Sequence, residues 1–426
     1  MGFLKVGAST IDITPPAGID LSGYIRRIGP STGVHDPLQA NILWLDDGAE
    51  CLLMISLDVL MMDEKYCSNV KTAISGELNI LPDNIIVAAI HTHSAPGMHF
   101  FRNGARRDLH WESDVFQSLL KGVVPAVQNA KKASMGFGLG NTEIGVNRRQ
   151  KKGPVDSRLP IVYFCGEDGN PIAAIAVYGC HPVVLNEQNR LISADYVGFF
   201  RKFLNEHFGS DFPVLFFTGA AGDVDPAERG NFSAAERCGR ILADEAASCF
   251  QRMMDFSHVD IGVFSTSVQL SYDGIPSVQE SKQRLRSAWK KYDMAKNRGS
   301  FEQQKIKGAF VLWAEEIYNM ALNCDLPHFI EAQMQCVRIG PVLFLASPFE
   351  LFATTSLALN KILMAQNICP VGYANGYAGY LPDSKSAKEE GYEVDEAYKY
   401  TGMLPLSSES EGIFLDAALK MVSHFI

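Results

Sequence analysis

The sequence predicts an α/β fold in which a mixed, largely parallel central sheet, or more than one such sheet, is flanked by helices in αβα layers. Short apolar runs rich in β-branched residues alternate along the chain with longer amphipathic segments of helical periodicity. Nearly every apolar run ends in a cluster of polar, Gly and Pro residues, which is typical of a buried strand that passes into a turn. The composition, 47% hydrophobic and 20% charged residues, is that of an ordinary globular protein.

Six apolar runs are the clearest predicted strands. The run that ends just before His91 is representative, because turn residues bound it at 82–84 and again at 96–97. Short β-branched runs of this kind are expected to lie in a mostly buried sheet. The predicted strands are residues 51–57, 84–90, 172–178, 213–217, 342–346 and 371–374.

Two helix starts are marked by capping-box patterns, in which a serine is followed by a glutamate three residues later. Ser233 with Glu236 predicts the start of a helix over residues 237–253. Ser277 with Glu280 predicts the start of a second helix, whose apolar residues recur at helical spacing.

A helical hairpin is predicted as an insertion at about residues 276–325. Its second helix covers roughly 301–322, after a polar break at 296–300. Either the two helices pack on the core as surface helices, or they form a lid or substrate-binding element. No linker rich in Pro, Gly or Ser separates two units, so residues 1–426 are predicted to form a single domain with this insertion.

Charge and cysteine content exclude some classes of protein. The net charge of −10 argues against a nucleic-acid partner, and every apolar run breaks well short of the roughly 18 residues that span a membrane. The nine cysteines are scattered without a CxxC motif, which favours reduced thiols, and residues 1–7 lack an apolar signal core. A cytoplasmic protein is therefore predicted, or a secreted or periplasmic one if a signal sequence has been removed.

Chemically active side chains follow the predicted strands. If the strands are mostly parallel, their carboxyl ends meet at one place and assemble one site. Two His and one Glu are a known catalytic zinc set that leaves a position open for water, so this inventory suits a metal-dependent hydrolase. The residues are His91, His93, His181, Asp223, Asp225, Glu350, Tyr377 and Tyr380.

Each of these signals also has a purely structural interpretation. A single His after a strand is more often a hydrogen-bonded structural residue than a ligand. Residues 222–225 can be a turn held by Asx hydrogen bonds. The loop 218–222 can cradle a phosphate, but it lacks the Lys and Ser/Thr of a P-loop.

The order of these motifs resembles the catalytic N-terminal domain of the neutral/alkaline, non-lysosomal ceramidase family. The most specific element is His91-Thr92-His93-Ser94-Ala95-Pro96-Gly97, and the ordered series that contains it runs through almost the whole chain. The other matching elements are residues 6–14, Gly23-Tyr24, Asn147-Arg148, His181, 191–196, 222–226, 348–350 and 375–380.

The resemblance implies one zinc ion held by His91, His181, Glu350 and Tyr380. Tyr380 is assigned in preference to Tyr377 because it matches the second Tyr of the family motif. His93 and Arg148 match positions that line the site and hold the substrate or its developing oxyanion. The immunoglobulin-like C-terminal domain and the secretion signal of full-length members are not expected in this chain.

One position departs from the family. Where its members have a serine in Gly-Asp-x-Ser-Pro, this chain has Asp225. An aspartate cannot imitate a serine alkoxide. It can act as a general base on a metal-activated water, orient that water, or help to bind a second cation.

The sequence therefore predicts a zinc-dependent hydrolase of an N-acyl amide, ceramidase-like, that uses a metal-activated water. Asp225 would accept the proton of the water, and His93 and Arg148 would stabilise the oxyanion. The substrate would be a small-molecule or lipid-like amide, such as a sphingolipid. Two alternatives stay open: a metal-dependent esterase or phosphoesterase in which Asp223 and Asp225 bind a second cation, and a non-catalytic relative that binds an acyl or lipid ligand.

Overall fold

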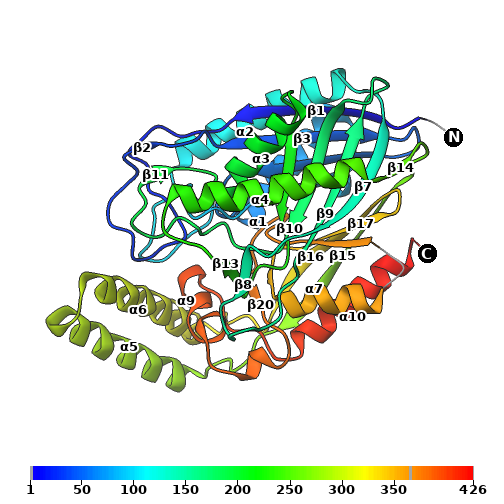
Figure 1. Cartoon of the computed structure of the whole chain (residues 1–426). Coiled ribbons are helices and arrows are strands. Elements are labelled where there is room, and N and C mark those ends of the chain that lie inside the picture. The colour runs from blue at the N-terminus through cyan, green and yellow to red at the C-terminus, as the bar shows by residue number, and fades with distance from the viewer. Residues whose placement is uncertain (1–2, 364–366, 426) are drawn as a thin grey trace.

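Three sheets of four or five strands form the body of the molecule in this computed structural model, which describes residues 3–363 and 367–425 (Figure 1). The first sheet has the order β5 (Ile85–Ala89), β4 (Cys51–Leu57), β3 (Gln39–Asp46), β1 (Lys5–Asp12), β6 (Lys131–Lys132). The second has the order β12 (Val214–Thr218), β10 (Pro171–Tyr178), β9 (Arg158–Cys165), β7 (Ser134–Asn141), β14 (Met254–Phe256). The third has the order β15 (Ile261–Ser271), β16 (Phe329–Ile339), β17 (Val342–Ala346), β19 (Asn367–Val371).

A pair of helices belongs to each sheet, and the other faces of the sheets meet in one shared core. That core takes side chains from all three sheets, for example Met54, Phe164 and Phe344. Apolar side chains need cover on both faces of such sheets, and the helices supply it on the outside. The helices are α1 (Glu64–Leu78) and α2 (Leu109–Gln128) on the first sheet, α3 (Tyr196–Phe208) and α4 (Phe232–Gln251) on the second, and α7 (Ala353–Ile362) and α10 (Ser410–Ser423) on the third.

One parallel strand pair lies at an edge of each sheet, and a helix connects its two strands. The pairs are β4 with β5 through α1, β10 with β12 through α3, and β17 with β19 through α7. Along β4, the side chains of Leu53 and Ile55 face the helices, whereas Leu52 and Met54 face the shared core. Burial on both faces explains why these strands are continuous apolar runs in the sequence.

A mixed α/β fold is therefore observed, but the prediction of largely parallel sheets is not confirmed. Most strand pairs are antiparallel, including β1 with β3, β7 with β9 and β15 with β16. Five of the six predicted strands correspond to β4, β5, β10, β12 and β17, which are all members of parallel pairs. The sixth, residues 371–374, overlaps β19 only at Val371. Strands with polar alternation or several glycines, such as β1, β7 and β16, do not form apolar runs, so they were missed.

The predicted helical hairpin is formed by α5 (Val278–Arg298) and α6 (Phe301–Leu322), which pack on one another and project from the body (Figure 1). The capping box of Ser277 and Glu280 is present as predicted. The predicted capping box of Ser233 and Glu236 is wrong. Helix α4 already begins at Phe232, because the Asn231 side chain accepts the Ala234 N–H and caps it.

Short elements complete the chain near the carboxyl ends of the parallel strands. Three two-stranded pairs join distant segments: β2 (Gly33–Val34) with β11 (Leu191–Ile192), β8 (Gly145–Asn147) with β13 (Val224–Pro226), and β18 (Glu350–Leu351) with β20 (Tyr380–Leu381). The remaining helical elements are η1 (Pro82–Asn84), η2 (Ser386–Lys388), α8 (Tyr392–Asp395) and α9 (Ala397–Thr401). Among the described residues, no helix is both long and apolar enough to cross a membrane.

Candidate active site

The carboxyl ends of three edge strands, one from each sheet, lie side by side. The Ala89 N–H at the end of β5 donates to the Tyr373 carbonyl after β19, at 3.1 Å. The Gly372 N–H donates to the carbonyl of Thr218, the last residue of β12, at 2.9 Å. Because each strand runs parallel to its partner, the polar residues that follow the strands project into one region. One parallel pair in each sheet is therefore enough to bring these residues together, and the sheets need not be largely parallel.

Three imidazole rings occupy the region. Ligand atoms of His91, His93 and His181 all lie within 4.8 Å of one another. His91 directly follows Ile90 and has a φ of 68°, in the left-handed region that a residue other than glycine seldom adopts. Strained backbone of this kind is concentrated at functional sites, where the surroundings hold it in place.

Backbone carbonyls fix the tautomers of two of the rings. Nδ1 of His91 lies 2.7 Å from the Leu60 carbonyl oxygen, and Nδ1 of His181 lies 3.2 Å from that of Val224. A carbonyl accepts only, so each Nδ1 carries the hydrogen and each Nε2 lone pair faces the site. Metal-binding histidines are commonly oriented in this way by an outer partner.

Glu350 completes the cluster from β18, the short strand that follows β17 of the third sheet. The parallel pairing of β18 and β20 sets Glu350 opposite Tyr380. Its Oε2 lies 3.0 Å from Nε2 of His181 and 3.7 Å from Nε2 of His91. The Tyr377 hydroxyl donates to Oε1 at 2.6 Å, and the Tyr373 hydroxyl donates to Oε2 at 3.1 Å.

The protonation states leave several electron pairs directed at one point. Burial lowers the pKa of His91 to about 4, so that imidazole is neutral at pH 7. Burial favours the neutral form of Glu350, but the His91 and His181 rings and the Tyr377 hydroxyl outweigh it and hold its pKa at about 2. A carboxylate and imidazole lone pairs that converge at such short range fit a divalent transition metal.

His93 lies beside this cluster with both of its ring nitrogens buried. Neither nitrogen has a hydrogen-bond partner within residues 3–363 and 367–425. Burial, together with the His91 and His181 rings, lowers the pKa of His93 well below its usual value. Gly23 makes room for the ring, since a Cβ at that position would come within 2.4 Å of it.

Arg148 connects the cluster to the loop that contains Asp225. Its Nη2 donates to the Gly222 carbonyl at 2.7 Å and to the Tyr380 hydroxyl at 3.2 Å. Nη1 lies 3.2 Å from Oδ1 of Asp225, whose Oδ2 pairs with Arg229 at 2.8 Å. Burial raises the pKa of Asp225, but Arg148, His181 and Arg229 outweigh it and keep its pKa below the usual value.

The structure thus brings all seven predicted site residues into one region. Their chemical roles stay predictions. The Tyr380 hydroxyl faces Arg148, whereas Tyr377, the alternative ligand, faces Glu350. Asp223 accepts the Ala353 N–H at 2.8 Å and an Asn147 amide hydrogen at 2.6 Å, so its carboxylate is already engaged, and a second cation has little support.

Sequence interpretation missed three residues of the site. Tyr373 stacks on the His91 ring with centroids 4.0 Å apart, Arg229 pairs with Asp225, and the buried Glu393 accepts from Arg148 at 2.8 Å. Tyr373 lies inside the predicted strand 371–374, so it was read as a strand residue, whereas β19 ends at Val371. Arg229 and Glu393 lie in polar segments with no feature that distinguishes them from ordinary surface residues.

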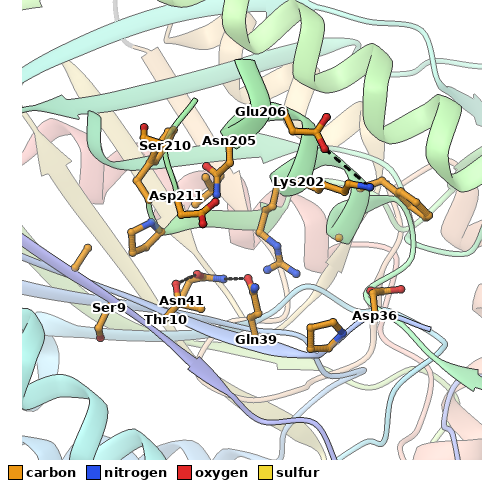
Figure 2. A pocket seen from close by; sticks show the side chains of 18 of the residues that line it. Ser9, Thr10, Asp36, Gln39, Asn41, Lys202, Asn205, Glu206, Ser210 and Asp211 are labelled. Atoms are coloured by element: carbon orange, nitrogen blue, oxygen red, sulfur yellow. Dashed lines mark hydrogen bonds and ion pairs between the residues drawn. The ribbon is translucent and has the colours of Figure 1, made fainter. Parts of the chain in front are cut away.

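A large cavity of about 1080 Å³ lies away from this region, between β1 and β3 on one side and α3 on the other. Figure 2 shows polar side chains such as Gln39 and Asn41 facing Asn205 and Asp211 across the hollow. None of the predicted site residues lines it. The candidate site is therefore defined by its side-chain chemistry rather than by this cavity.

Comparison with known proteins agrees with this geometry. Residues 4–148 match the family model described as "Neutral/alkaline non-lysosomal ceramidase, N-terminal". The predicted resemblance to the ceramidase family is confirmed. The matched segment contains His91, His93 and Arg148, whereas His181, Glu350 and Tyr380 lie beyond it.

Curated neutral ceramidases are similar over about half of the chain. Neutral ceramidase A of Dictyostelium discoideum is 25% identical over 258 residues, which are 53% of this chain and 36% of the relative. The neutral ceramidase of Drosophila melanogaster is 24% identical over 256 residues, with 52% and 36% covered. The match thus spans about a third of the length of these relatives.

The fold likeness extends further than the sequence likeness. The crystal structure of the neutral ceramidase from Pseudomonas aeruginosa superposes with a TM-score of 0.76 at 16% identity. The superposition covers 99% of this chain and 74% of the solved one. The ceramidase-like fold therefore holds for almost the whole chain, including the segments that carry His181, Glu350 and Tyr380.

The predicted cytoplasmic location is wrong. Neutral ceramidases related to this chain are secreted or membrane-associated enzymes, extracellular or periplasmic. The prediction rested on the lack of an apolar signal core in residues 1–7 and on the scattered cysteines. Seven of the nine cysteines are buried and only Cys324 is exposed. Burial raises the pKa of the Cys67, Cys180 and Cys369 thiols, for example. Inert buried thiols persist in oxidising surroundings, so they do not indicate a compartment.

Proposed function

We propose that this chain is a ceramidase-like amidohydrolase that cleaves the amide bond of an N-acyl lipid of the ceramide type and depends on zinc. The observation that carries the proposal is the convergence of His91, His181 and Glu350 from segments that follow strands of three different sheets. Two His and one Glu are a ligand set known from catalytic zinc sites. The family match and the shared fold support the same reaction class.

The proposed metal ligands are His91, His181, Glu350 and Tyr380. A bound zinc ion would supply Lewis-acid chemistry, since it polarises a carbonyl and makes water nucleophilic near neutral pH. His93 belongs to the same imidazole cluster, so it is the competing ligand. Its two unpartnered nitrogens suit a different role, in which one N–H donates to the oxygen of the scissile carbonyl.

Two charged side chains would position the reactants. The Arg148 guanidinium contacts Tyr380 and Asp225 at once, so it can hold both and place positive charge near a developing oxyanion. The Asp225 carboxylate, with its lowered pKa, is a weak base. It is better suited to accept a hydrogen bond from the attacking water and to fix its direction than to remove its proton.

The proposal is tested by metal analysis of the purified chain followed by a panel of N-acyl substrates. We expect about one zinc per chain and release of fatty acid from ceramides, with both lost in His181→Ala. Short and long acyl chains in the panel would identify the substrate class. A chain that folds, holds no transition metal and shows no metal-dependent change in melting temperature would contradict the proposal.

A second candidate, a non-catalytic relative that binds an acyl ligand, is favoured by one observation. Asp225 stands where the family has serine, and both of its oxygens face guanidinium groups. This position then supplies neither a hydroxyl nucleophile nor an unpaired base. Binding of a fluorescent ceramide without any turnover, unchanged in Asp225→Asn, would select this candidate.

A further inference from the structure

A cavity of about 530 Å³ lies in the projecting hairpin, where α5 and α6 meet α9. Its volume is within the range of small-ligand sites. Four cationic side chains line it, and Asp273 is the carboxylate among its lining residues. The four are Arg284 and Lys291 from α5, Lys307 from α6, and Lys399 from α9.

None of these four cations has a carboxylate oxygen within 4.0 Å in the described parts of the chain. The three lysines share this with most other lysines. For Arg284 it is less common, because most arginines of the body have such a partner. Arg284 donates only to the Gly274 carbonyl at 3.2 Å, and Lys399 donates to the Asp395 carbonyl. Burial, aided by Lys291 and Lys307 and opposed by Glu396 and Asp395, lowers the pKa of Lys399.

Aromatic rings form the floor of the cavity. The Lys399 ammonium lies 4.8 Å from the centroid of Phe310, 5.6 Å from that of Trp313 and 5.2 Å from that of Tyr398. Lys307 lies 4.9 Å from the Phe310 centroid. Ring faces hold the ammonium groups in place while leaving their hydrogens free to bind an anion.

The charge of the hairpin contrasts with that of the whole chain. Residues 278–322 contain nine lysines and arginines but five acidic residues, in a chain whose net charge is −10. An isolated run of charges is usually a solvated face. Here the cations come from three helices and converge on one aromatic-floored cavity, which is the arrangement of an anion site.

We propose that this cavity binds a phosphate-type oxyanion, either as the headgroup of an anionic lipid or as a free ion. The oxyanion would accept hydrogen bonds from Lys307, Lys399 and Arg284 and would relieve the repulsion among the ammonium groups. The aromatic floor and the exposed Trp289 on the same hairpin suit the lipid form, because aromatic side chains lie well at a membrane interface. The site is independent of the proposed hydrolase chemistry.

The test compares two variants of equal charge. Lys307→Gln/Lys399→Gln changes the cavity, and Lys282→Gln/Lys296→Gln changes two exposed lysines of the same hairpin outside it. Binding of inorganic phosphate is measured by calorimetry, and binding to vesicles by co-sedimentation. The vesicles contain phosphatidylcholine alone or phosphatidylcholine with phosphatidylglycerol.

We expect the cavity variant to bind the anionic probe about 30-fold more weakly, because each lysine contributes roughly fivefold near an anionic surface. The control should lose less than about threefold. Phosphate binding without vesicle binding would assign the free ion, and vesicle binding without phosphate binding would assign the headgroup. Equal losses in both variants, or no binding of either anionic probe, would overturn the proposal. Lys291→Gln, at an exposed position, serves if the double variant fails to fold.

Discussion

The candidate active site and the hairpin cavity both hold several charged side chains, but they differ in whether those charges have partners within the protein. In the active site, Arg148 faces Asp225 and Glu393, and the Glu350 carboxylate receives two tyrosine hydroxyls. In the hairpin cavity, Arg284, Lys291, Lys307 and Lys399 have no such internal partners within the described residues. Buried charge in the body is already balanced by the fold, whereas the hairpin leaves its charge for a ligand.

The largest effect on the candidate active site is expected from His181→Ala. It removes a predicted metal ligand, so we expect loss of zinc and a fall in kcat/KM on the order of 10⁴-fold, as for a member of a cooperating catalytic set. Metal content and ceramide turnover are measured on the same sample. His207→Ala, at an exposed histidine on α3, is the matched control and should retain both. Full activity without metal would refute the assignment.

His93→Ala separates ligation from catalysis in the same cluster. If His93 donates to the oxyanion, kcat should fall about 10²- to 10³-fold while the zinc content stays near one per chain. Metal analysis beside steady-state kinetics measures the two effects. If His93→Ala loses as much zinc as His181→Ala, His93 is a metal ligand. It would then replace Tyr380 in the proposed ligand set.

The contrast between body and hairpin also applies to packing. Ile55 in β4 is fully buried between helices and strands, so Ile55→Ala should lower the free energy of unfolding by about 2–5 kcal/mol. Trp289 on α5 is 43% exposed, and Trp289→Ala should change it by less than about 1 kcal/mol. Urea denaturation measures both. Comparable losses would mean that the hairpin is part of the cooperative core.

A smaller effect than that of Ile55→Ala is expected at Asp156, a paired carboxylate of the body. Arg158 and the Ser356 hydroxyl outweigh the opposing effect of burial and lower the pKa of Asp156. A lowered folded pKa stabilises the fold above the unfolded value near 4, and this stabilisation is lost as the pH falls through the folded pKa.

Asp156→Asn should therefore cost about 1–3 kcal/mol at neutral pH and flatten the loss of stability below pH 4. Denaturation at several pH values measures the slope. Asp416→Asn, at an exposed position on α10, is the control and should change the slope less. An acid limb that stays as steep in Asp156→Asn as in the wild type would contradict this account.

Sequence interpretation found five almost completely buried strands. It missed alternating strands such as β16, and it also missed β3 and β9, which are as deeply buried. The doubly buried strands β4, β5, β10, β12 and β17 could be found from their apolar runs, and the residues that follow them include His91, His181 and Glu350. Strand direction could not be inferred, because pairing depends on distant segments. The predicted residues lie together in spite of this, since the strands that precede them belong to the parallel pairs.

The sequence could not predict which oxygen and nitrogen atoms of the site side chains contact one another. Nothing in the local pattern around Asp225 indicates that Arg148 and Arg229 face its two oxygens. The same holds for the choice between Tyr377 and Tyr380, which differ by three residues on one loop. Such details depend on how the short pairs β8 with β13 and β18 with β20 set the loops against each other.

The meeting of three sheets at one site has a consequence for biogenesis. His181 and Glu350 are 169 residues apart, so a nascent chain exposes the first histidines long before the glutamate leaves the ribosome. The proposed metal site would therefore form only after the segment that carries Glu350 has docked. Zinc uptake during refolding should accordingly follow the slowest docking step, and a chelator present from the start should leave the early sheets able to form.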